Sequence, residues 1–370
     1  MNILYIAPFK QNDGWGLGAR DYLRSLLSVK DFNVAACFYP TISVSTTNDM
    51  SEDIQKVDEK KLDKVDVIIQ KALVEGAVYA TSESVQQHIF LTYLENKNLS
   101  IHDSAILKEF SQLWSPCNFN AEILREYNPN ASSISHPIDT DHIKAILKHN
   151  PKISNSNSFK FYVVGEYIQR KNIKDTIIAF NLEFDPAVDD VQLIIKTSVP
   201  GSKNHHEARQ HIIHDIRKIK EQMRLKKPDI NAEQVLTERV SFEKLMALHN
   251  SCDCFVTSSY GESFCRGAAE ALCVGNPVIL HNTIGIIDNL DKQDYYEYET
   301  SEEPVILDQP EQMGILSIYN AEENWSKPNI ASLRKQMRLA YENRRKVDKE
   351  KYQEEFSYSN IGKKICQKLQ

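Results

Sequence analysis

The stretch that most constrains the fold runs from Val256 to Leu280 and reads as a strand, a loop, a helix, a tight turn and a second strand. Apolar and β-branched residues around Val256 indicate a buried parallel strand, which needs no alternation. Small and apolar residues from Arg266 to Val274 predict a helix, with Ser263 as its N-cap. Gly275-Asn276-Pro277 ends this helix, because proline cannot continue it. The stretch therefore predicts one unit of a parallel α/β sheet.

Two acids lie inside this unit. Glu262 is in the loop at the carboxyl end of the first strand, and Glu270 follows eight positions later, about two helical turns away. Ligands of open α/β sheets bind outside the carboxyl ends of the strands, so this loop is the expected place for small-molecule chemistry. The alternative is a pair of ordinary acids in salt bridges, and spacing alone favours neither interpretation.

Length and composition limit the class of protein. A chain of 370 residues favours two domains rather than one. The formal net charge of -7 argues against a nucleic-acid partner, since no positive field would assist binding. The seven cysteines show no CxxC pair, which argues against a metal ribbon and favours reduced thiols. Met1 starts no signal-peptide pattern and no apolar run reaches the roughly 20 residues of a membrane span, so we expect a cytoplasmic protein with at most peripheral membrane contact.

Glycines follow the first predicted strand, Asn2–Pro8. Gly14 and Gly16 precede a helix expected at Arg20–Val29, and such glycines let backbone N–H groups approach an anion. They formally match a dinucleotide-binding fingerprint, but the next strand, Asn33–Tyr39, is followed by no acid to hold a ribose. An NAD-linked oxidoreductase is therefore disfavoured. An anion-binding or substrate-gating loop is the better functional interpretation, and a flexible connector is the alternative.

Strands and helices alternate in both halves, which predicts two parallel sheets. The polar stretch Lys148–Ser158 has the composition of a linker. We therefore expect one domain over residues 1–150 and a second over residues 151–345. A C-terminal helical segment, 346–370, is expected to pack back on the N-terminal domain.

No metal site is predicted. His211 and His214 could share a helix face, but a solvated helix is favoured because no acid of fixed geometry accompanies them. Asp139-Thr140-Asp141 superficially matches a metal-binding DxD motif, yet it precedes a predicted helix, where aspartate is a good cap.

Several features occur in one order and together resemble the family 4 group of retaining glycosyltransferases with the GT-B fold. Glu262 and Glu270 look like the Glu-x7-Glu signature of that family, and Gly275–Ile279 looks like its Gly-x-Pro-Val turn. The run VVGEYIQRKNIKDTIIAF, Val163–Phe180, is similar to its Gly-Arg-x4-Lys-Gly strand and helix. Two further segments with this likeness are Ser135–Asp141, which would close the first domain, and the glycine-rich Gly14–Gly18.

The resemblance implies two Rossmann-like domains with parallel sheets facing across a cleft, and a C-terminal helical tail. The domain over residues 1–150 would be the acceptor side, and the domain over residues 151–345 would bind the nucleotide-sugar donor. It also implies a retaining transferase that moves a sugar from a UDP-, GDP- or ADP-linked donor to a sugar, glycan or glycolipid acceptor. No cofactor and no obligatory metal would be needed, because cations and backbone N–H groups stabilise the leaving diphosphate.

By position, the resemblance assigns roles to individual residues. Glu270 would hold the ribose hydroxyls, Glu262 would contact the donor sugar in catalysis, and Lys171 would meet the diphosphate. Further residues expected near the phosphates or the donor sugar are Gly14, Gly16, Arg170, Ser263, Phe264 and Cys265.

Three departures from the family pattern involve four positions. Glu166 stands where an arginine is usual, so Arg170 would have to supply that charge. Asn172 replaces a glycine, a mild change because asparagine tolerates left-handed backbone conformations. Ser263 and Cys265 replace glycines around the first acid.

The first-domain catalytic partner has two candidates, His102 and Glu95. Two other functions stay open beside the transferase. One is a catalytically weak or inactive sugar-nucleotide-binding protein of the same fold, suggested by Glu166, and the other is the oxidoreductase.

Overall fold

The structure is a computed structural model that divides the chain into two compact units. Unit 1 comprises Met1–Thr140 and Gln353–Gln370, and unit 2 comprises Asp141–Tyr352. The described residues are 1–41, 45–47, 50–80, 82–95, 99, 101–149, 158–185, 187–225, 232–307 and 323–370, with the backbone alone at 101–103.

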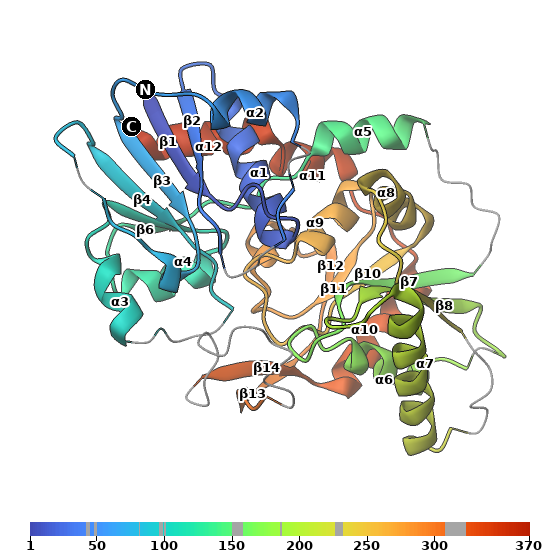
Figure 1. Cartoon of the computed structure of the whole chain (residues 1–370). Coiled ribbons are helices and arrows are strands. Elements are labelled where there is room, and N and C mark those ends of the chain that lie inside the picture. The colour runs from blue at the N-terminus through green and yellow to red at the C-terminus, as the bar shows by residue number, and fades with distance from the viewer. Residues whose placement is uncertain are drawn as a thin grey trace. The chain divides into compact units, whose positions relative to one another are not determined.

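Unit 1 is built on a six-stranded sheet in the order β2-β1-β3-β4-β5-β6, and its strand pairs are parallel. Figure 1 shows these strands side by side. The chain places β2 on one side of β1 and β3 on the other, so the order of the strands reverses between β1 and β3. The strands are β1 (Asn2–Ala7), β2 (Asn33–Phe38), β3 (Val67–Lys71), β4 (Gln87–Leu91), β5 (Gln112–Ser115) and β6 (Ala131–Ser133).

Helices from both ends of the chain complete unit 1. Helix α12 (Tyr358–Leu369) packs on α1 (Gly14–Leu27), and its Ile361, Ile365 and Leu369 belong to the same buried core as β1 and β3. Gly362 permits this contact, since a Cβ there would lie 2.5 Å from the carbonyl oxygen of Ser25. The other helices of this unit are α2 (Glu52–Asp58), α3 (Ile101–Leu107) and α4 (Asn118–Arg125).

Two sequence predictions in unit 1 are wrong. Helix α1 begins at Gly14 rather than Arg20, so Gly14 and Gly16 lie in its first turn and not in a loop. The Asp13 side chain caps this turn by accepting a hydrogen bond from the amide of Gly16, which offsets the low helix propensity of glycine. The alternation of strands and helices also predicts a helix between the strands near Val65–Ile69 and His88–Leu94. Among the residues that the structure describes, only a short 3-10 turn, Val74–Gly76, lies there.

Unit 2 holds the second sheet, in the order β12-β11-β10-β7-β8-β9, again with parallel pairs. Strand β11 occupies the three residues predicted, Val278–Leu280. An antiparallel pair, β13 (Thr300–Pro304) with β14 (Asn324–Pro328), stands apart from this sheet. The other strands are β7 (Phe159–Glu166), β8 (Val191–Ser198), β9 (Glu233–Leu236), β10 (Cys254–Val256) and β12 (Tyr295–Glu297).

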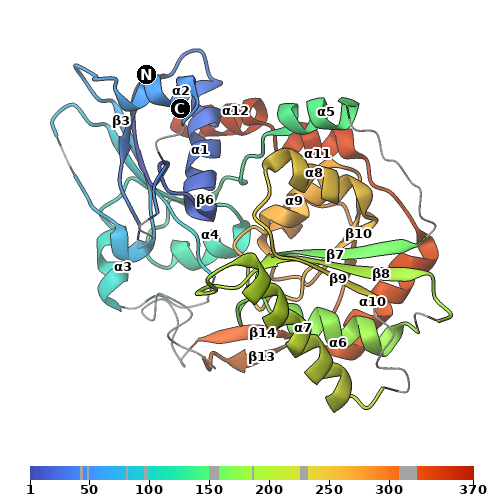
Figure 2. The same ribbon diagram turned by 45° about the vertical axis from the view of Figure 1, so that its right-hand side comes forward.

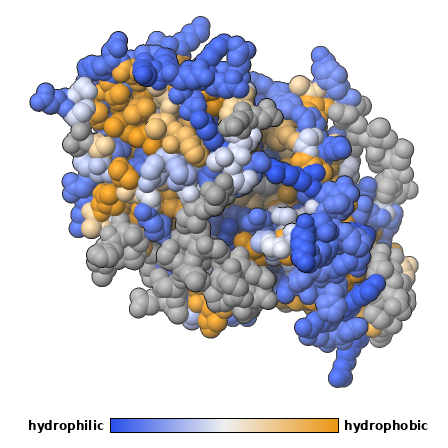
Figure 3. Space-filling view, in the orientation of Figure 1, coloured by the Kyte–Doolittle hydropathy of each residue, from blue (hydrophilic) through white to orange (hydrophobic). Residues whose placement is uncertain are grey.

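The helices of unit 2 pack on that sheet through apolar faces. Figure 2 shows α6 (Ile173–Glu183) between α10 (Ile330–Asn343) and α7 (His205–Gln222). The outer face of α7 is hydrophilic in Figure 3, which agrees with the solvated helix expected for its histidines. Helices α8 (Phe242–Ser251) and α9 (Arg266–Cys273) flank β10, and η2 (Gly285–Asn289) is a 3-10 turn. Helices α5 (Thr140–His149) and α11 (Lys349–Glu355) lie where the chain passes between the units.

Some predictions fall on residues that are not described. The boundary at residue 150 and most of the linker lie outside the described ranges. The sequence also predicts a helix at Pro310–Asn320, and this segment is outside them too. Within those ranges, no helix has both the length and the hydropathy required to cross a membrane.

Candidate functional site

The candidate site of unit 2 lies where the strand order of its sheet reverses. Strand β7 comes first in this unit and has β8 on one side and β10 on the other. Ligands of open α/β sheets bind outside the carboxyl ends of the strands at such a point. The loops that leave β7 and β10 there carry Arg170, Lys171 and Glu262.

Glu262 brings these two loops together. The Lys171 Nζ lies 2.5 Å from the Glu262 Oε1, and the Arg170 Nη1 lies 3.2 Å from the same oxygen. Arg170 also donates to the carbonyl oxygen of Gly261 at 2.7 Å. The side chain of Glu262 is 9% exposed and that of Lys171 is 26% exposed, so the lysine is the more accessible partner. Two cations and one acid give the cluster a net charge of +1.

The charge state of this cluster follows from its contacts. Burial raises the pKa of the Glu262 carboxyl, but Lys171 and Arg170 outweigh burial and hold that pKa below its usual value. Glu262 is therefore a carboxylate at neutral pH.

The loop after β7 is fixed by the loop after β10. The carbonyl oxygen of Arg170 accepts hydrogen bonds from the Tyr260 amide at 2.8 Å and from the Ser259 hydroxyl at 3.0 Å. Asn172 donates to the carbonyl oxygen of Ser258 at 3.1 Å. Asn172 adopts φ +46°, so the prediction that asparagine here accepts a left-handed backbone is confirmed. These bonds set the positions from which Arg170 and Lys171 project.

Cys265 starts helix α9 in an unusual conformation. Its φ is +71°, in the left-handed region that favours glycine, and it occupies the N-cap position. The prediction that Ser263 caps the helix is therefore wrong, because two more residues are needed before the chain turns into the helix. Ser263, Phe264 and Cys265 are all buried, at 5%, 4% and 9% exposure.

Glu270 lies on α9 beside Arg266 and His249. The Arg266 Nε lies 2.8 Å from the Glu270 Oε1, and the His249 Nε2 lies 3.5 Å from Oε2. Burial raises the pKa of this carboxyl, but Arg266 and His249 together lower it by more than burial raises it. The pKa of Glu270 therefore lies below its usual value. The Tyr162 hydroxyl, 2.9 Å from the His249 Nδ1, holds the imidazole in place.

Each acid is thus an ionised carboxylate in an ion pair with neighbouring cations. The family pattern led us to Glu262 and Glu270 but not to Arg266 or His249. Arg266 could have been found, because it precedes Glu270 by one helical turn. His249 lies on a different helix, α8, and only the packing of α8 on α9 brings it close.

Glu166, the residue that replaces a cation in the family pattern, is exposed at the end of β7. Arg170 is 7% exposed and lies beside Glu262, where it supplies positive charge together with Lys171. The cationic side of the cluster thus comes from two consecutive residues of one loop.

The predicted residues of unit 1 lie near the carboxyl edge of the first sheet. Gly14 is open to a side chain, whereas a Cβ at Gly16 would lie 2.0 Å from the Gln11 carbonyl oxygen. Glu95 is half-buried four residues after the end of β4. His102 belongs to α3 by its backbone, but its side chain lies outside the described part of the chain.

No group of three or more His, Cys, Asp or Glu residues suited to a metal ion occurs among the described residues. The Asp139 Oδ2 lies 3.7 Å from the Arg24 Nη1, and the Asp141 Oδ1 lies 3.1 Å from the Lys144 Nζ. Both acids of the DxD match are therefore ion-paired.

Comparisons with known proteins agree with this description. Residues 145–294 match the model of the family described as glycosyl transferases group 1. No curated protein sequence gives a significant match.

Solved structures resemble all or most of the chain. HepE of Anabaena in complex with UDP is 12% identical, has a TM-score of 0.56, and aligns over 100% of this chain and 99% of its own. Sucrose-phosphate synthase of Thermosynechococcus elongatus is 12% identical with a TM-score of 0.59, over 99% and 98% of the two chains. The α,α-trehalose-phosphate synthase (UDP-forming) of Burkholderia xenovorans, in complex with glucose-6-phosphate, is 11% identical with a TM-score of 0.58, over 82% and 72%.

The predicted GT-B glycosyltransferase fold is confirmed by these matches. Lys171, Glu262 and Glu270 all lie within residues 145–294, the part of the chain that matches the group 1 glycosyltransferase model.

Proposed function

We propose that the protein is a retaining glycosyltransferase that moves a sugar from a nucleotide-diphosphate sugar to a carbohydrate acceptor. The observation that carries this proposal is the convergence of Arg170 and Lys171 on Glu262 at the point where the strand order of the second sheet reverses. Departure of a nucleoside diphosphate leaves negative charge on its phosphates, and cations held in place beforehand stabilise that charge.

In this account Lys171 and Arg170 bind the diphosphate. Lys171 is the more exposed cation, so it would contact the phosphates directly, and Arg170 would act from behind it. The N-terminal end of α9, formed by Cys265 and Arg266, adds the partial positive charge of a helix terminus. These groups supply the positive charge that other transferases take from a metal ion, which supports transfer without an obligatory metal or cofactor.

The two acids have separate roles. Glu262 stays a carboxylate because of its cations, and a carboxylate accepts hydrogen bonds from sugar hydroxyls. We assign it to the donor sugar. Glu270 is held by Arg266 and His249 on α9, and we assign its carboxylate to the vicinal hydroxyls of the ribose.

The uracil base is the proposed nucleotide preference. It is supported by the UDP complex of HepE and by the UDP-forming synthase, both of which share the fold. The hexose transferred, the acceptor and the retaining stereochemistry belong to the proposal, and so do contacts of Gly14, Gly16, Ser263 and Phe264 with the donor. Glu95 and His102 are the candidates for a catalytic group in unit 1.

The test is binding and turnover with UDP-, GDP- and ADP-sugars. We expect UDP-sugars to raise the melting temperature and to be slowly hydrolysed without an acceptor. Glu270→Gln is expected to weaken UDP binding about tenfold and 2′-deoxy-UDP binding by a smaller factor, because the lost partner is a ribose hydroxyl.

Glu243→Gln is the matched control, since Glu243 is an exposed glutamate on the neighbouring helix α8. It should leave both affinities unchanged. If no nucleotide sugar changes the melting temperature, or if Glu270→Gln has no effect on any of them, the proposal is lost. Binding without hydrolysis or transfer to any acceptor would show instead a sugar-nucleotide-binding protein.

A further inference from the structure

Unit 1 contains a buried lysine that the proposed chemistry does not use. Lys71 is the last residue of β3, its side chain is fully buried, and its Nζ has no hydrogen-bond partner among the described residues. Burial lowers its pKa to about 7. An amine buried without a hydrogen-bonding partner destabilises the fold, and such groups gather at functional sites.

Two aromatic rings lie close to the amine. The Lys71 Nζ lies 4.4 Å from the ring centroid of Trp15 and 4.4 Å from that of Tyr93. The two rings stack on each other with centroids 5.1 Å apart. Trp15 belongs to the first turn of α1, and Tyr93 is the second residue after β4. Both are partly exposed, so an aromatic surface is accessible beside the buried amine.

These residues lie where the topology of the first sheet favours a ligand. The strand order reverses between β1 and β3, and ligands bind outside the carboxyl ends of strands at such a point. Strand β3 ends at Lys71, and β1 leads into the helix that carries Trp15. Thr92, directly after β4, has a fully buried hydroxyl without a hydrogen-bond partner in the described ranges.

The charges around Lys71 indicate the kind of ligand. Asp13 and Asp21, both on the α1 side, are the acids whose charge acts on the amine. Two acids and one amine give a neighbourhood that does not attract a phosphate or a carboxylate. An uncharged sugar suits it better, because a sugar ring has an apolar face for aromatic packing and hydroxyls for polar groups.

We propose that Trp15 and Tyr93 bind an uncharged sugar ring of the acceptor and that Lys71 holds the two rings in position. This inference rests on the proposed function, because it assigns the acceptor of the same transferase. Lys71 is a positioning residue, since its amine is enclosed behind the rings and acts through cation–π attraction to them.

The test measures sugar binding without nucleotide, by the intrinsic fluorescence of the full chain. The probes are glucose, maltose and a panel of other neutral mono- and disaccharides, with glucose 6-phosphate at the same ionic strength. At least one neutral sugar should change the fluorescence saturably, and glucose 6-phosphate should bind no more tightly than glucose. Trp325→Phe, a substitution in unit 2, should preserve that affinity.

Three variants isolate the aromatic pair, each checked for an unchanged melting transition. With the neutral sugar, now followed by calorimetry, Trp15→Ala should lose at least tenfold in affinity, and Trp15→Phe, which keeps a ring, less than about threefold. Lys71→Met should lose severalfold in sugar affinity while UDP still raises its melting temperature as in the wild type. That separation distinguishes a positioning role from a general structural defect.

The inference is overturned if no neutral sugar in the panel binds, if Trp15→Ala binds as well as the wild type, or if glucose 6-phosphate binds at least tenfold more tightly than glucose. A failure of UDP to bind would contradict the proposed function but not the sugar measurement, so the two can fail separately.

Discussion

Cys265 adopts a strained backbone conformation in the loop that leads into α9. Its φ of +71° places a side chain in a backbone region where glycine is preferred, at a cost of about 1 kcal/mol. The conformation turns the chain into α9 directly after Phe264. Asn172 is also left-handed, at φ +46°, but asparagine tolerates this conformation better than cysteine does.

Substitution of Cys265 tests this strain. Because the strain belongs to the backbone, Cys265→Gly should be more stable to urea than Cys265→Ala by about 1 kcal/mol. The opposite order is expected at Cys273, the last residue of helix α9, because a helical backbone favours alanine over glycine. Equal stability of the two Cys265 variants would show that the left-handed conformation is not strained.

Lys71 gives the stability of unit 1 a pH dependence. Its pKa is about 7 in the folded state and 10.5 in the unfolded chain, so the unfolded state binds more protons between these values. The free energy of unfolding therefore rises with pH in this window, by up to about 1.4 kcal/mol per pH unit.

The matching variant is Lys71→Met, which keeps an unbranched side chain without the titrating amine. The difference in unfolding free energy between wild type and variant should change in favour of the wild type from pH 7 to pH 8.5. Urea titrations at several pH values measure it, and the cysteines and tyrosines that both proteins share contribute equally and cancel in the difference. A difference that does not vary with pH would mean that the amine keeps its ordinary pKa.

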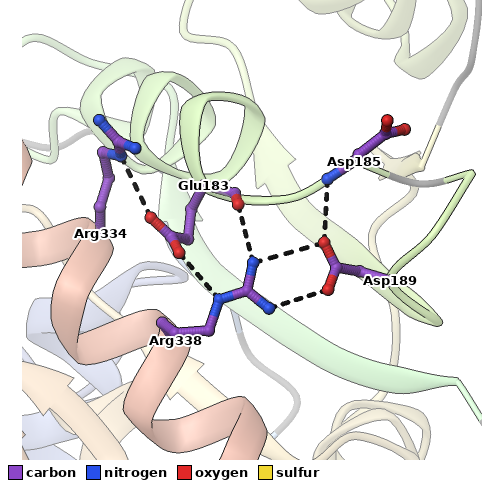
Figure 4. A network of polar contacts seen from close by, with 5 residues as sticks. All are labelled: Glu183, Asp185, Asp189, Arg334 and Arg338. Atoms are coloured by element: carbon purple, nitrogen blue, oxygen red, sulfur yellow. Dashed lines mark hydrogen bonds and ion pairs between the residues drawn. The ribbon is translucent and has the colours of Figure 1, made fainter.

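At the scale of the elements, an ion-pair network joins α6 to α10. Figure 4 shows Arg338 of α10 between Glu183, at the end of α6, and Asp189 in the following loop. The Arg338 Nε lies 2.8 Å from the Glu183 Oε1, and its Nη1 lies 2.8 Å from the Asp189 Oδ1. The Arg334 Nε lies 3.2 Å from the Glu183 Oε2. Arg338 also donates to the carbonyl oxygen of Glu183, which satisfies the C-terminal end of α6.

Removal of the central cation should loosen this packing. Arg338→Met is expected to lower the free energy of unfolding by about 1 to 2 kcal/mol, because it removes the one donor that Glu183, Asp189 and the end of α6 share. Lys335→Met, at an exposed position on the same helix, is the control and should change stability by less than about 0.5 kcal/mol. Urea unfolding measures both changes, and an equal loss of unfolding free energy in the two variants would contradict a specific network.

The elements that the sequence predicted well are those set by local chemistry. The turn at Gly275 and the β-branched run after it fixed β11, and helix α9 begins at Arg266 as expected. The glycines before α1 misled because glycine favours loops, whereas the cap from Asp13 and the tight approach at Gly16 extend the helix through them. Local propensity could not reveal those tertiary contacts.

At the scale of the molecule, order and spacing predicted two parallel sheets and the GT-B fold, because each βα unit must bury its apolar face against a sheet. The same order led to Glu262, Glu270 and Lys171. It did not lead to His249 or Lys71, because a histidine on another helix and a lysine that ends an apolar strand carry no local signal of burial.

The central claim is that Lys171 and Arg170, the two cations paired with Glu262, bind the diphosphate of a nucleotide sugar. The most direct measurement is calorimetric titration of UDP and of UMP into the wild type, Lys171→Met and Lys174→Met. Lys174 is an exposed cation three residues further on, paired with Asp215, and serves as the matched control.

We predict that Lys171→Met weakens UDP binding at least tenfold, about 1.4 kcal/mol, and UMP binding by less than threefold. Lys174→Met should bind both nucleotides as the wild type does. Equal affinity of Lys171→Met and the wild type for UDP would contradict the account.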